Sequence, residues 1–501
     1  MYTSISIINK LRSAPYRVCL LAGMLSGFVF APFFLFPLIF SFALFAYHAQ
    51  KSCNYWQAFK VGLCFGWGHF LVGLYWISMA PYVSDERLWW AVPIACFGIP
   101  AVLSLFTASI SCLAYTFRDF RLFNFIFVFF WVLAEWLRCW IFTGFPWNLL
   151  GYSLSFCLEL CQCASIFGTL GLSAIVAYVA IAPIHLLNDQ KTLFKRHVLI
   201  CTIILSAMYC GGKLRLNSAP TEFTPILARL VQPSIEHHAK WDQEKFADVL
   251  ATHINLSIID SKNKADLIIW PESALPSVIT DQYLVDLIAK YLHKNQLLIT
   301  GATGQSSDAK DLYVGMYGIN SEGKIVLEYN KTHLVPFGEY IPFKFLPIKK
   351  ITHGLSDYTP GNIDQEVYLK SLNLKINALL CYEVIFPEEV RRKSIDQDLI
   401  INITYDTWFG SSPGLHQHFH AARLRAIENG IPLLRVANNG ISAIIDCLGR
   451  ILQQTQINDK TYLEGYIPKK NSHRTIWSQD STLAIALLFL ALLILEAHKL
   501  K

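Results

Sequence analysis

Three residues that could carry acyl-transfer chemistry, Glu272, Lys331 and Cys381, each stand one or two positions after a short apolar run. The runs are 267–270, 324–329 and 374–380. Short apolar runs bounded by turn residues are typical of buried strands. In α/β sheets, reactive groups collect at the carboxyl ends of strands. We therefore expect a carboxylate, an ammonium and a thiol to project from three strand ends.

Each of these groups has a role in nucleophilic acyl transfer. A thiol with its usual pKa of about 8.5 is mostly protonated at neutral pH, so a cysteine nucleophile needs a base or a nearby cation. Glu272 could remove the thiol proton and later return it to the leaving group. Lys331, with backbone N–H groups, could stabilise the oxyanion that forms when the thiolate attacks a carbonyl. The pattern predicts Cys381 as a nucleophile.

The segment 211–479 that contains these residues reads as an α/β domain. Further strands are predicted at 226–231, 297–300, 399–404, 433–436 and 441–446, and helices at 241–261, 282–294 and 418–429. Turn residues at 320–323 and 447–450 indicate hairpins. A mixed sheet covered by helices is the expected architecture.

The rest of the chain has a different composition. Of the 501 residues, 53% are hydrophobic and 16% are charged, and the mean hydropathy is +0.38. These values exclude a single soluble globule and a disordered chain. Eight apolar stretches approach the ~20 residues needed to cross a membrane. They are 14–30, 32–48, 57–79, 89–116, 122–142, 161–187, 197–212 and 482–497.

These stretches define the predicted domains. Residues 1–212 form a membrane domain with seven transmembrane helices, 213–479 a catalytic domain, and 480–501 a C-terminal transmembrane helix with a short cytoplasmic tail. Lys and Arg gather before the first stretch and after the second, fourth, sixth and eighth. The distribution predicts cytoplasmic termini and a catalytic domain on the outer side. The net charge of +6 gives no nucleic-acid signature, so no nucleic-acid partner is expected.

Three sequence blocks around the reactive residues resemble the catalytic blocks of the nitrilase (carbon–nitrogen hydrolase) superfamily. They are Trp270-Pro271-Glu272-Ser273, the block 330–340 that begins Asn330-Lys331-Thr332, and the block 381–388 that begins Cys381-Tyr382-Glu383. The resemblance implies an α-β-β-α sandwich with Glu272 as general base, Lys331 as oxyanion-stabilising lysine and Cys381 as nucleophile.

Longer blocks across the whole chain resemble one member family, the apolipoprotein N-acyltransferases. They include Glu135-x-x-Arg138, Thr143-Gly144-Phe145-Pro146-Trp147, Lys240-Trp241-Asp242, Asp406-x-Trp408-Phe409-Gly410, Gln417-His418 and Asn438-Asn439-Gly440. This resemblance implies that Trp241, Glu339, Tyr382 and Glu383 surround the site. One position departs from the family pattern, which usually has Asn before the Asp of the Asp-x-Trp-Phe-Gly block. Here that position is Tyr405.

The resemblance also implies a reaction and its setting. Cys381 takes an acyl chain from a phospholipid, phosphatidylethanolamine in the family. The chain then passes to the α-amino group of the N-terminal S-diacylglyceryl-cysteine of an apolipoprotein. The enzyme lies in the bacterial inner membrane among membrane lipids, with its catalytic domain on the periplasmic side. No cofactor and no metal is implied.

Two other functions remain open from the residues alone. A membrane-anchored amidase of the nitrilase type would use the same three residues, with water attacking the thioester. A transporter or scaffold with an inactive outer domain is a third interpretation, against which the intact Glu272, Lys331 and Cys381 argue. Seven preceding spans favour lipid handling over the amidase, for which one anchoring helix would suffice.

Four local features have more than one interpretation. Cys381 and Cys447, the only cysteines of the outer domain, could form a disulfide. His416 and His420 are spaced for a metal, but no carboxylate completes the pattern. Glu135 and Arg138, in a membrane span, could neutralise each other or contact a lipid headgroup. The aromatic loop 335–346 could face the membrane as a lid or pack inside the domain.

Overall fold

The computed structural model describes residues 11–499 except 85, 241, 260–263, 280, 307, 309, 343–356 and 480. The chain folds into two compact units. The first, the helical unit, contains the chain up to Met79, Trp90–Ser218 and the chain from Gln479 onward. The second, the catalytic unit, contains Ala80–Trp89 and Ala219–Ser478.

Every one of the eight apolar stretches is helical in the structure. The helices are α2 (Pro15–Gly27), α3 (Phe42–Gln50), α4 (Tyr55–Leu74), α5 (Met79–Ser84), α6 (Ala91–Pro93), α7 (Ile99–Thr116), α8 (Phe123–Arg138), α9 (Leu158–Cys161), α10 (Ala164–Ala180), α11 (Ile184–Leu187), α12 (Lys191–Ser218) and α19 (Ser481–Lys499). Among the described residues, four continuous helical segments are long and apolar enough to cross a membrane: Tyr55–Ser84, Ala91–Thr116, Ala164–Leu187 and Lys191–Ser218. The number of crossings stays a prediction.

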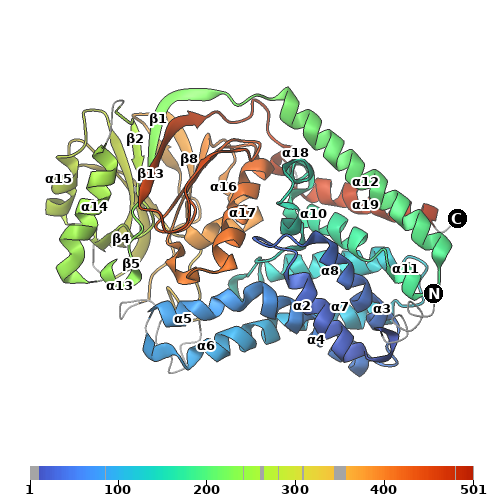
Figure 1. Cartoon of the computed structure of the whole chain (residues 1–501). Helices are drawn as coiled ribbons and strands as arrows, with labels where there is room; N and C mark the ends of the chain where they lie inside the picture. The colour runs from blue at the N-terminus through green and yellow to red at the C-terminus, as the bar shows by residue number, and fades with distance from the viewer. Residues whose placement is uncertain are drawn as a thin grey trace. The chain divides into compact units, whose positions relative to one another are not determined.

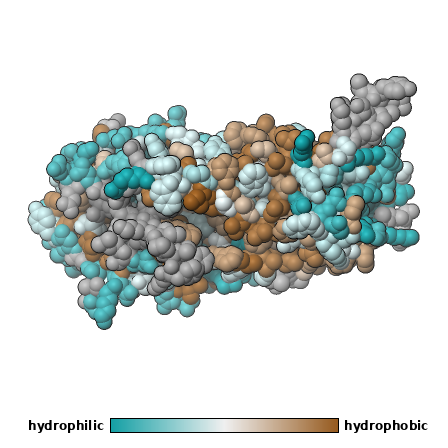
Figure 2. Space-filling model, turned by 90° about the horizontal axis from the view of Figure 1, so that it is seen from below, coloured by the Kyte–Doolittle hydropathy of each residue, from teal (hydrophilic) through white to brown (hydrophobic). Residues whose placement is uncertain are grey.

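Small residues bring the helices of this unit together. A Cβ atom on Gly66 of α4 would lie 1.9 Å from the hydroxyl of Thr107 on α7, and one on Gly68 would lie 2.4 Å from the carbonyl oxygen of Leu20 on α2. Close backbone approach of this kind is typical of helices packed in a membrane. Figure 2 shows a band of hydrophobic side chains on the surface of this unit, with hydrophilic residues at its far end. Trp56 and Leu199, for example, are 64% and 59% exposed.

Glu135 and Arg138 are both buried on α8 and form hydrogen bonds with the backbone of the segment that follows the helix. Glu135 Oε1 accepts the backbone N–H of Leu150 at 2.8 Å and the indole N–H of Trp131 at 3.0 Å. Arg138 donates to the carbonyl oxygen of Trp147 at 3.0 Å. The two charged side chains therefore fasten residues 147–150 to α8.

The catalytic unit contains two mixed sheets within its described residues. The first has seven strands in the order β13-β1-β2-β4-β5-β6, with β3 beside β4, and the second has six in the order β12-β11-β10-β9-β8-β7. The strands are β1 (Phe223–Gln232), β2 (Leu267–Ile269), β3 (Leu275–Val278), β4 (Leu297–Gln305), β5 (Leu312–Asn320), β6 (Ile325–Asn330), β7 (Val367–Leu369), β8 (Leu374–Leu380), β9 (Leu399–Thr404), β10 (Leu433–Ala437), β11 (Ala443–Ile445), β12 (Ile451–Gln454) and β13 (Thr461–Pro468). In each sheet the central strands run parallel and the outer ones antiparallel.

The two sheets stack face to face and helices cover their outer faces. Apolar residues of both sheets, such as Leu230, Ile269, Leu380 and Ile401, form one core between them. The helices of this unit are α13 (His237–Lys240), α14 (Phe246–Ile258), α15 (Gln282–Ala289), α16 (Pro387–Lys393), α17 (Pro413–Asn429) and α18 (Ile476–Gln479). As Figure 1 shows, α14 and α15 lie beside the first sheet, and α16 and α17 beside the second. The four layers confirm the expected α-β-β-α sandwich, in place of the single mixed sheet that the strand pattern alone predicted.

Candidate active site

The structure brings Glu272 and Lys331 into direct contact. Glu272 follows β2, Lys331 follows β6 directly, and Lys331 Nζ lies 3.2 Å from Glu272 Oε1. Cys381 follows β8 directly, and its thiol is close enough to interact electrostatically with both charged groups. All three side chains are buried. The three predicted strand ends therefore meet at one place.

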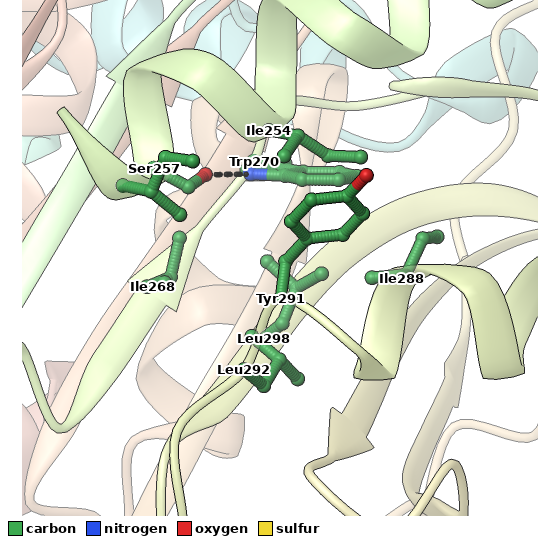
Figure 3. Close-up of a pocket in the computed structure, with 9 residues that line it drawn as sticks. Ile254, Ser257, Ile268, Trp270, Ile288, Tyr291, Leu292 and Leu298 are labelled. Atoms are coloured by element: carbon green, nitrogen blue, oxygen red, sulfur yellow. Dashed lines mark hydrogen bonds between the residues drawn. The ribbon is translucent and has the colours of Figure 1, made fainter.

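The turn that carries Glu272 is anchored on both sides. The indole N–H of Trp270 donates to Ser257 Oγ of α14 at 2.8 Å, as Figure 3 shows. On the other side the backbone rests against Gly301 of β4, where a Cβ atom would lie 2.5 Å from the backbone nitrogen of Ser273. Any side chain at position 301 would push the turn away, so the glycine is a requirement of the site.

Both oxygens of the Glu272 carboxylate have partners. Oε1 accepts from Lys331, and Oε2 accepts the backbone N–H of Tyr405 at 3.0 Å. Tyr405 follows β9 of the second sheet. The two sheets thus hold the carboxylate between them in one orientation, which suits a group that must meet a thiol proton at a defined angle.

The Lys331 ammonium lies between two carboxylates. Its second partner is Glu339, at 2.6 Å between Nζ and Oε1. Burial alone would lower the pKa of Lys331, but Glu272 and Glu339 raise it above its ordinary value. Lys331 therefore carries a full positive charge at neutral pH, which an oxyanion-stabilising group needs. Burial also raises the pKa of Glu339.

Cys381 begins a short 3₁₀ turn, Cys381–Ile385, at the end of β8. Its φ of +44° lies in the left-handed region that residues other than glycine rarely adopt. Burial raises the pKa of the Cys381 thiol, Glu272 raises it further, and Lys331 lowers it. The resting thiol is therefore protonated, and the nucleophile depends on a base for activation.

Glu383 accepts hydrogen bonds from the segment that carries Lys331 and from the segment that carries Cys381. It receives the backbone N–H of Leu380 at 2.8 Å, the hydroxyl of Tyr329 at 2.8 Å and the backbone N–H of Thr332 at 2.8 Å. Burial alone would raise the pKa of Glu383, but Lys393 and the backbone N–H of Leu380 lower it to about 2. Glu383 is thus an ionised anchor between the Lys331 segment and the Cys381 turn.

The remaining predicted residues have mixed outcomes. Tyr382 is buried and its ring lies 5.1 Å from Phe386 and 5.6 Å from His333, in an aromatic cluster beside the nucleophile. Trp241 lies outside the described residues. Of the loop 335–346, residues 335–342 are described, and most of them are half-buried. Whether this loop is a membrane-facing lid stays a prediction.

A buried cluster next to Cys381 was not identified from the sequence as part of the site. His418 Nε2 lies 3.2 Å from the Cys381 carbonyl oxygen, and His418 Nδ1 lies 3.1 Å from Asp406 Oδ1. Arg435 Nη2 contacts Asp406 Oδ2 at 2.8 Å and His418 Nδ1 at 3.1 Å. Burial and Arg435 lower the pKa of His418, while the hydrogen bonds and charge of Asp406 oppose that shift. The imidazole ring is therefore held between the Cys381 carbonyl oxygen on one side and Asp406 with Arg435 on the other.

The side chains of Cys381, Asp406 and His418 converge as metal ligands can, with the nearest donor atoms within 4.8 Å of one another. Here the Arg435 guanidinium already supplies a cation to Asp406 and fills the second nitrogen of His418. The donor set does not fit a metal. In the sequence, His418 could have been found through the Gln417-His418 block. The metal-like spacing of His416 and His420 drew the interpretation to the neighbouring histidines instead.

Neither Cys381 nor Cys447 is part of a disulfide. Cys447 lies 3.3 Å from the side-chain oxygen of Asn471, in the turn between β11 and β12. The disulfide interpretation is therefore wrong for this structure, and the thiol of Cys381 is available for catalysis.

Comparisons with known proteins cover both units. Residues 227–472 match the family model for carbon-nitrogen hydrolase, and residues 22–182 match the model for the apolipoprotein N-acyltransferase N-terminal domain. The apolipoprotein N-acyltransferase of Rickettsia prowazekii is 46% identical over 94% of this chain and 95% of its own length. That of Brucella melitensis is 37% identical over 82% of this chain and 80% of its own. The solved structure of an amidase from Nesterenkonia sp. aligns with 54% of this chain and 98% of its own, at 18% identity and a TM-score of 0.38. The full-length matches to curated relatives place this chain in the apolipoprotein N-acyltransferase family.

Proposed function

We propose that Cys381, Glu272 and Lys331 carry out the N-acylation of lipoproteins by this bacterial membrane enzyme. The membership of the chain in the acyltransferase family establishes the reaction. The observation that supports the residue roles is the contact of Lys331 with Glu272 at 3.2 Å, beside a buried thiol that needs a base.

In the first half-reaction, Glu272 takes the thiol proton and Cys381 Sγ attacks the ester carbonyl of a phospholipid. The Lys331 ammonium stabilises the tetrahedral oxyanion. The intermediate collapses to an acyl thioester, the C–O bond of the ester breaks, and the lysophospholipid oxygen takes the proton from Glu272. Glu339 holds the Lys331 ammonium in place. Without Glu339, the ammonium would pair with Glu272 alone and the base would be less available to the thiol.

In the second half-reaction, the neutral α-amine of the diacylglyceryl-cysteine attacks the thioester carbon. Glu272 accepts a proton from the amine as the N–C bond forms, and Lys331 again stabilises the oxyanion. The C–S bond breaks and the departing thiolate takes the proton back from Glu272. The products are an N-acylated lipoprotein and the resting thiol.

The finer assignments belong to the same proposal. The acyl donor is phosphatidylethanolamine, and the acceptor is the N-terminal cysteine of a diacylated apolipoprotein. Residues 1–212 and 480–501 form the membrane domain, both termini are cytoplasmic, and residues 213–479 act on the periplasmic side. The basic residues of alternate links support this orientation.

An experiment with full-length protein separates transfer from hydrolysis. The protein in lipid nanodiscs is supplied with phosphatidylethanolamine bearing an alkyne-tagged acyl chain, with and without a diacylated lipopeptide. We expect a tagged lipopeptide in amounts equal to the lysophospholipid released, and no product with a lipopeptide whose amine is acetylated. Release of free tagged fatty acid without tagged lipopeptide would instead support the amidase, which the full-length acyltransferase relatives do not favour.

A further inference from the structure

Tyr405 stands where the family usually has Asn, and the structure gives this tyrosine contacts that an asparagine could not make. It is 3% exposed and follows β9 of the second sheet. Its backbone N–H binds Glu272 Oε2 at 3.0 Å, a contact that any residue here could make. Any specific role of Tyr405 must therefore come from its side chain.

The hydroxyl of Tyr405 reaches the segment 233–240 that follows β1 and ends in the single helical turn α13, referred to below as the loop 233–240. It lies 3.1 Å from His237 Nδ1, and the His237 ring packs 4.8 Å from Trp408. Burial raises the pKa of Tyr405, so the hydroxyl keeps its proton and shares a hydrogen bond with His237. An asparagine side chain is several ångströms shorter and would leave His237 without this partner.

The ring of Tyr405 contacts a second residue of the same loop, Lys240. Lys240 Nζ lies 3.5 Å from the ring centroid, within the range of a cation–π contact, and donates to the carbonyl oxygen of Glu272 at 3.3 Å. Lys240 thereby joins the ring of Tyr405 to the backbone of Glu272. Burial lowers the pKa of Lys240 to about 7, and Glu272 opposes that shift.

The beginning of this loop is held by a different residue. Asn438 accepts the backbone N–H of Ile235 at 3.2 Å and donates to the carbonyl oxygen of Ile235 at 2.7 Å. The end of the loop, with His237 and Lys240, contacts Tyr405 and leads directly into Trp241. The Tyr405 side chain thus restrains the part of the loop nearest the site.

We propose that Tyr405 is a positioning residue that fixes the loop 233–240 against the turn of Glu272 and so sets the orientation of the Glu272 carboxylate. The inference rests on the proposed role of Glu272 as base. Because Tyr405 acts through Glu272, it should affect the rate of the chemical step more than phospholipid binding.

The test measures single-turnover formation of the Cys381 thioester by full-length protein in nanodiscs, over a range of phospholipid concentrations. Tyr405→Phe, which loses only the hydroxyl, should lower the rate constant at saturation about fivefold, the effect of one hydrogen bond. Tyr405→Leu and Tyr405→Asn, which also lose the ring, should lower it about thirtyfold. The half-saturating concentration should change by less than about twofold. Tyr368→Phe on β7, which removes a hydroxyl hydrogen bond to Asn373, is the matched control.

A double-mutant cycle with His237→Ala tests the contact itself. Tyr405→Phe and His237→Ala remove the same bond, and His237→Ala also removes the ring contact with Trp408, so the double variant should be no slower than the slower of the two single variants. Additive effects, an unchanged rate constant in Tyr405→Asn, or a change confined to half-saturation would overturn the proposal. Glu272→Gln separates this outcome from failure of the proposed function: full thioester formation by Glu272→Gln would refute the base, whatever Tyr405 does. Thermal unfolding identifies any variant that has lost its fold.

Discussion

Lys331 bonds the carboxylate of Glu339 at 2.6 Å, and Glu339 stands eight residues later in the same segment. The other oxygen of Glu339 accepts the backbone N–H of Val335 at 2.7 Å. Glu339 therefore links the Lys331 ammonium to the backbone of the same segment, 331–339. This link gives Lys331 a partner other than Glu272, so the base remains available to the thiol.

Glu339→Gln should slow thioester formation. The amide keeps the shape but cannot hold the ammonium electrostatically, and Lys331 would turn to Glu272. Loss of one charge-assisted bond corresponds to about a tenfold to hundredfold lower single-turnover rate. Glu328→Gln, on the exposed side of β6, is the matched control and should react at the normal rate. A Glu339→Gln enzyme with unchanged rate would show that Glu272 alone positions Lys331.

Glu383 should stabilise the fold at neutral pH and lose that effect in acid. Its pKa is about 2 in the folded protein, below the ordinary 4.5, so the ionised form favours folding at every pH above about 4.5. As pH falls from about 4.5 to about 2, this contribution, on the order of 3 kcal/mol, disappears. Glu383→Gln should therefore unfold at a lower temperature than the native chain at pH 7, and the difference should shrink towards pH 3. A difference that is the same at both pH values would contradict the ionised anchor.

His418 should support the nucleophile through the Cys381 carbonyl oxygen. His418→Ala removes the contact of Nε2 with the carbonyl oxygen of Cys381, a residue with a φ of +44°, and it also leaves a cavity beside Asp406 and Arg435. We expect about a tenfold loss of thioester formation, the effect of about 1.4 kcal/mol. His418→Gln, whose amide can donate to the same oxygen, should recover part of the rate. If glutamine and alanine were equally slow, the bond to Cys381 would not be what His418 contributes.

The catalytic strands could be predicted because each is a short, continuous apolar run. The structure gives β8 and β9 the predicted bounds, and Glu272, Lys331 and Cys381 all follow their strands as expected. The strands β3, β5, β7, β12 and β13 were missed. β5 contains Gly315 and Gly318, which break its apolar run, and β12 is half exposed and ends in two glutamines. Strands buried on both faces also carry no signal of which sheet they join, so the division into two sheets was not visible in the strand pattern.

The supporting contacts of the site could not be predicted from spacing. His418 is 37 residues from Cys381, and Tyr405 is 133 residues from Glu272. Tyr405 meets Glu272 because strands of the two stacked sheets end at the same edge, and His418 reaches Cys381 from helix α17. Sequence distance predicts neither contact. Local chemistry identified the reacting groups, whereas the groups that orient them depend on the tertiary fold.

The central claim is that Cys381 carries the acyl chain. The most direct measurement is the intact mass of the full-length protein after incubation with a phospholipid of one defined acyl chain and no acceptor. We predict a single adduct of one acyl mass on the Cys381 peptide, which hydroxylamine or a diacylated lipopeptide removes and which Cys381→Ala never forms. An adduct that persists in Cys381→Ala, or a native chain that N-acylates the lipopeptide without ever forming this thioester, would contradict the account.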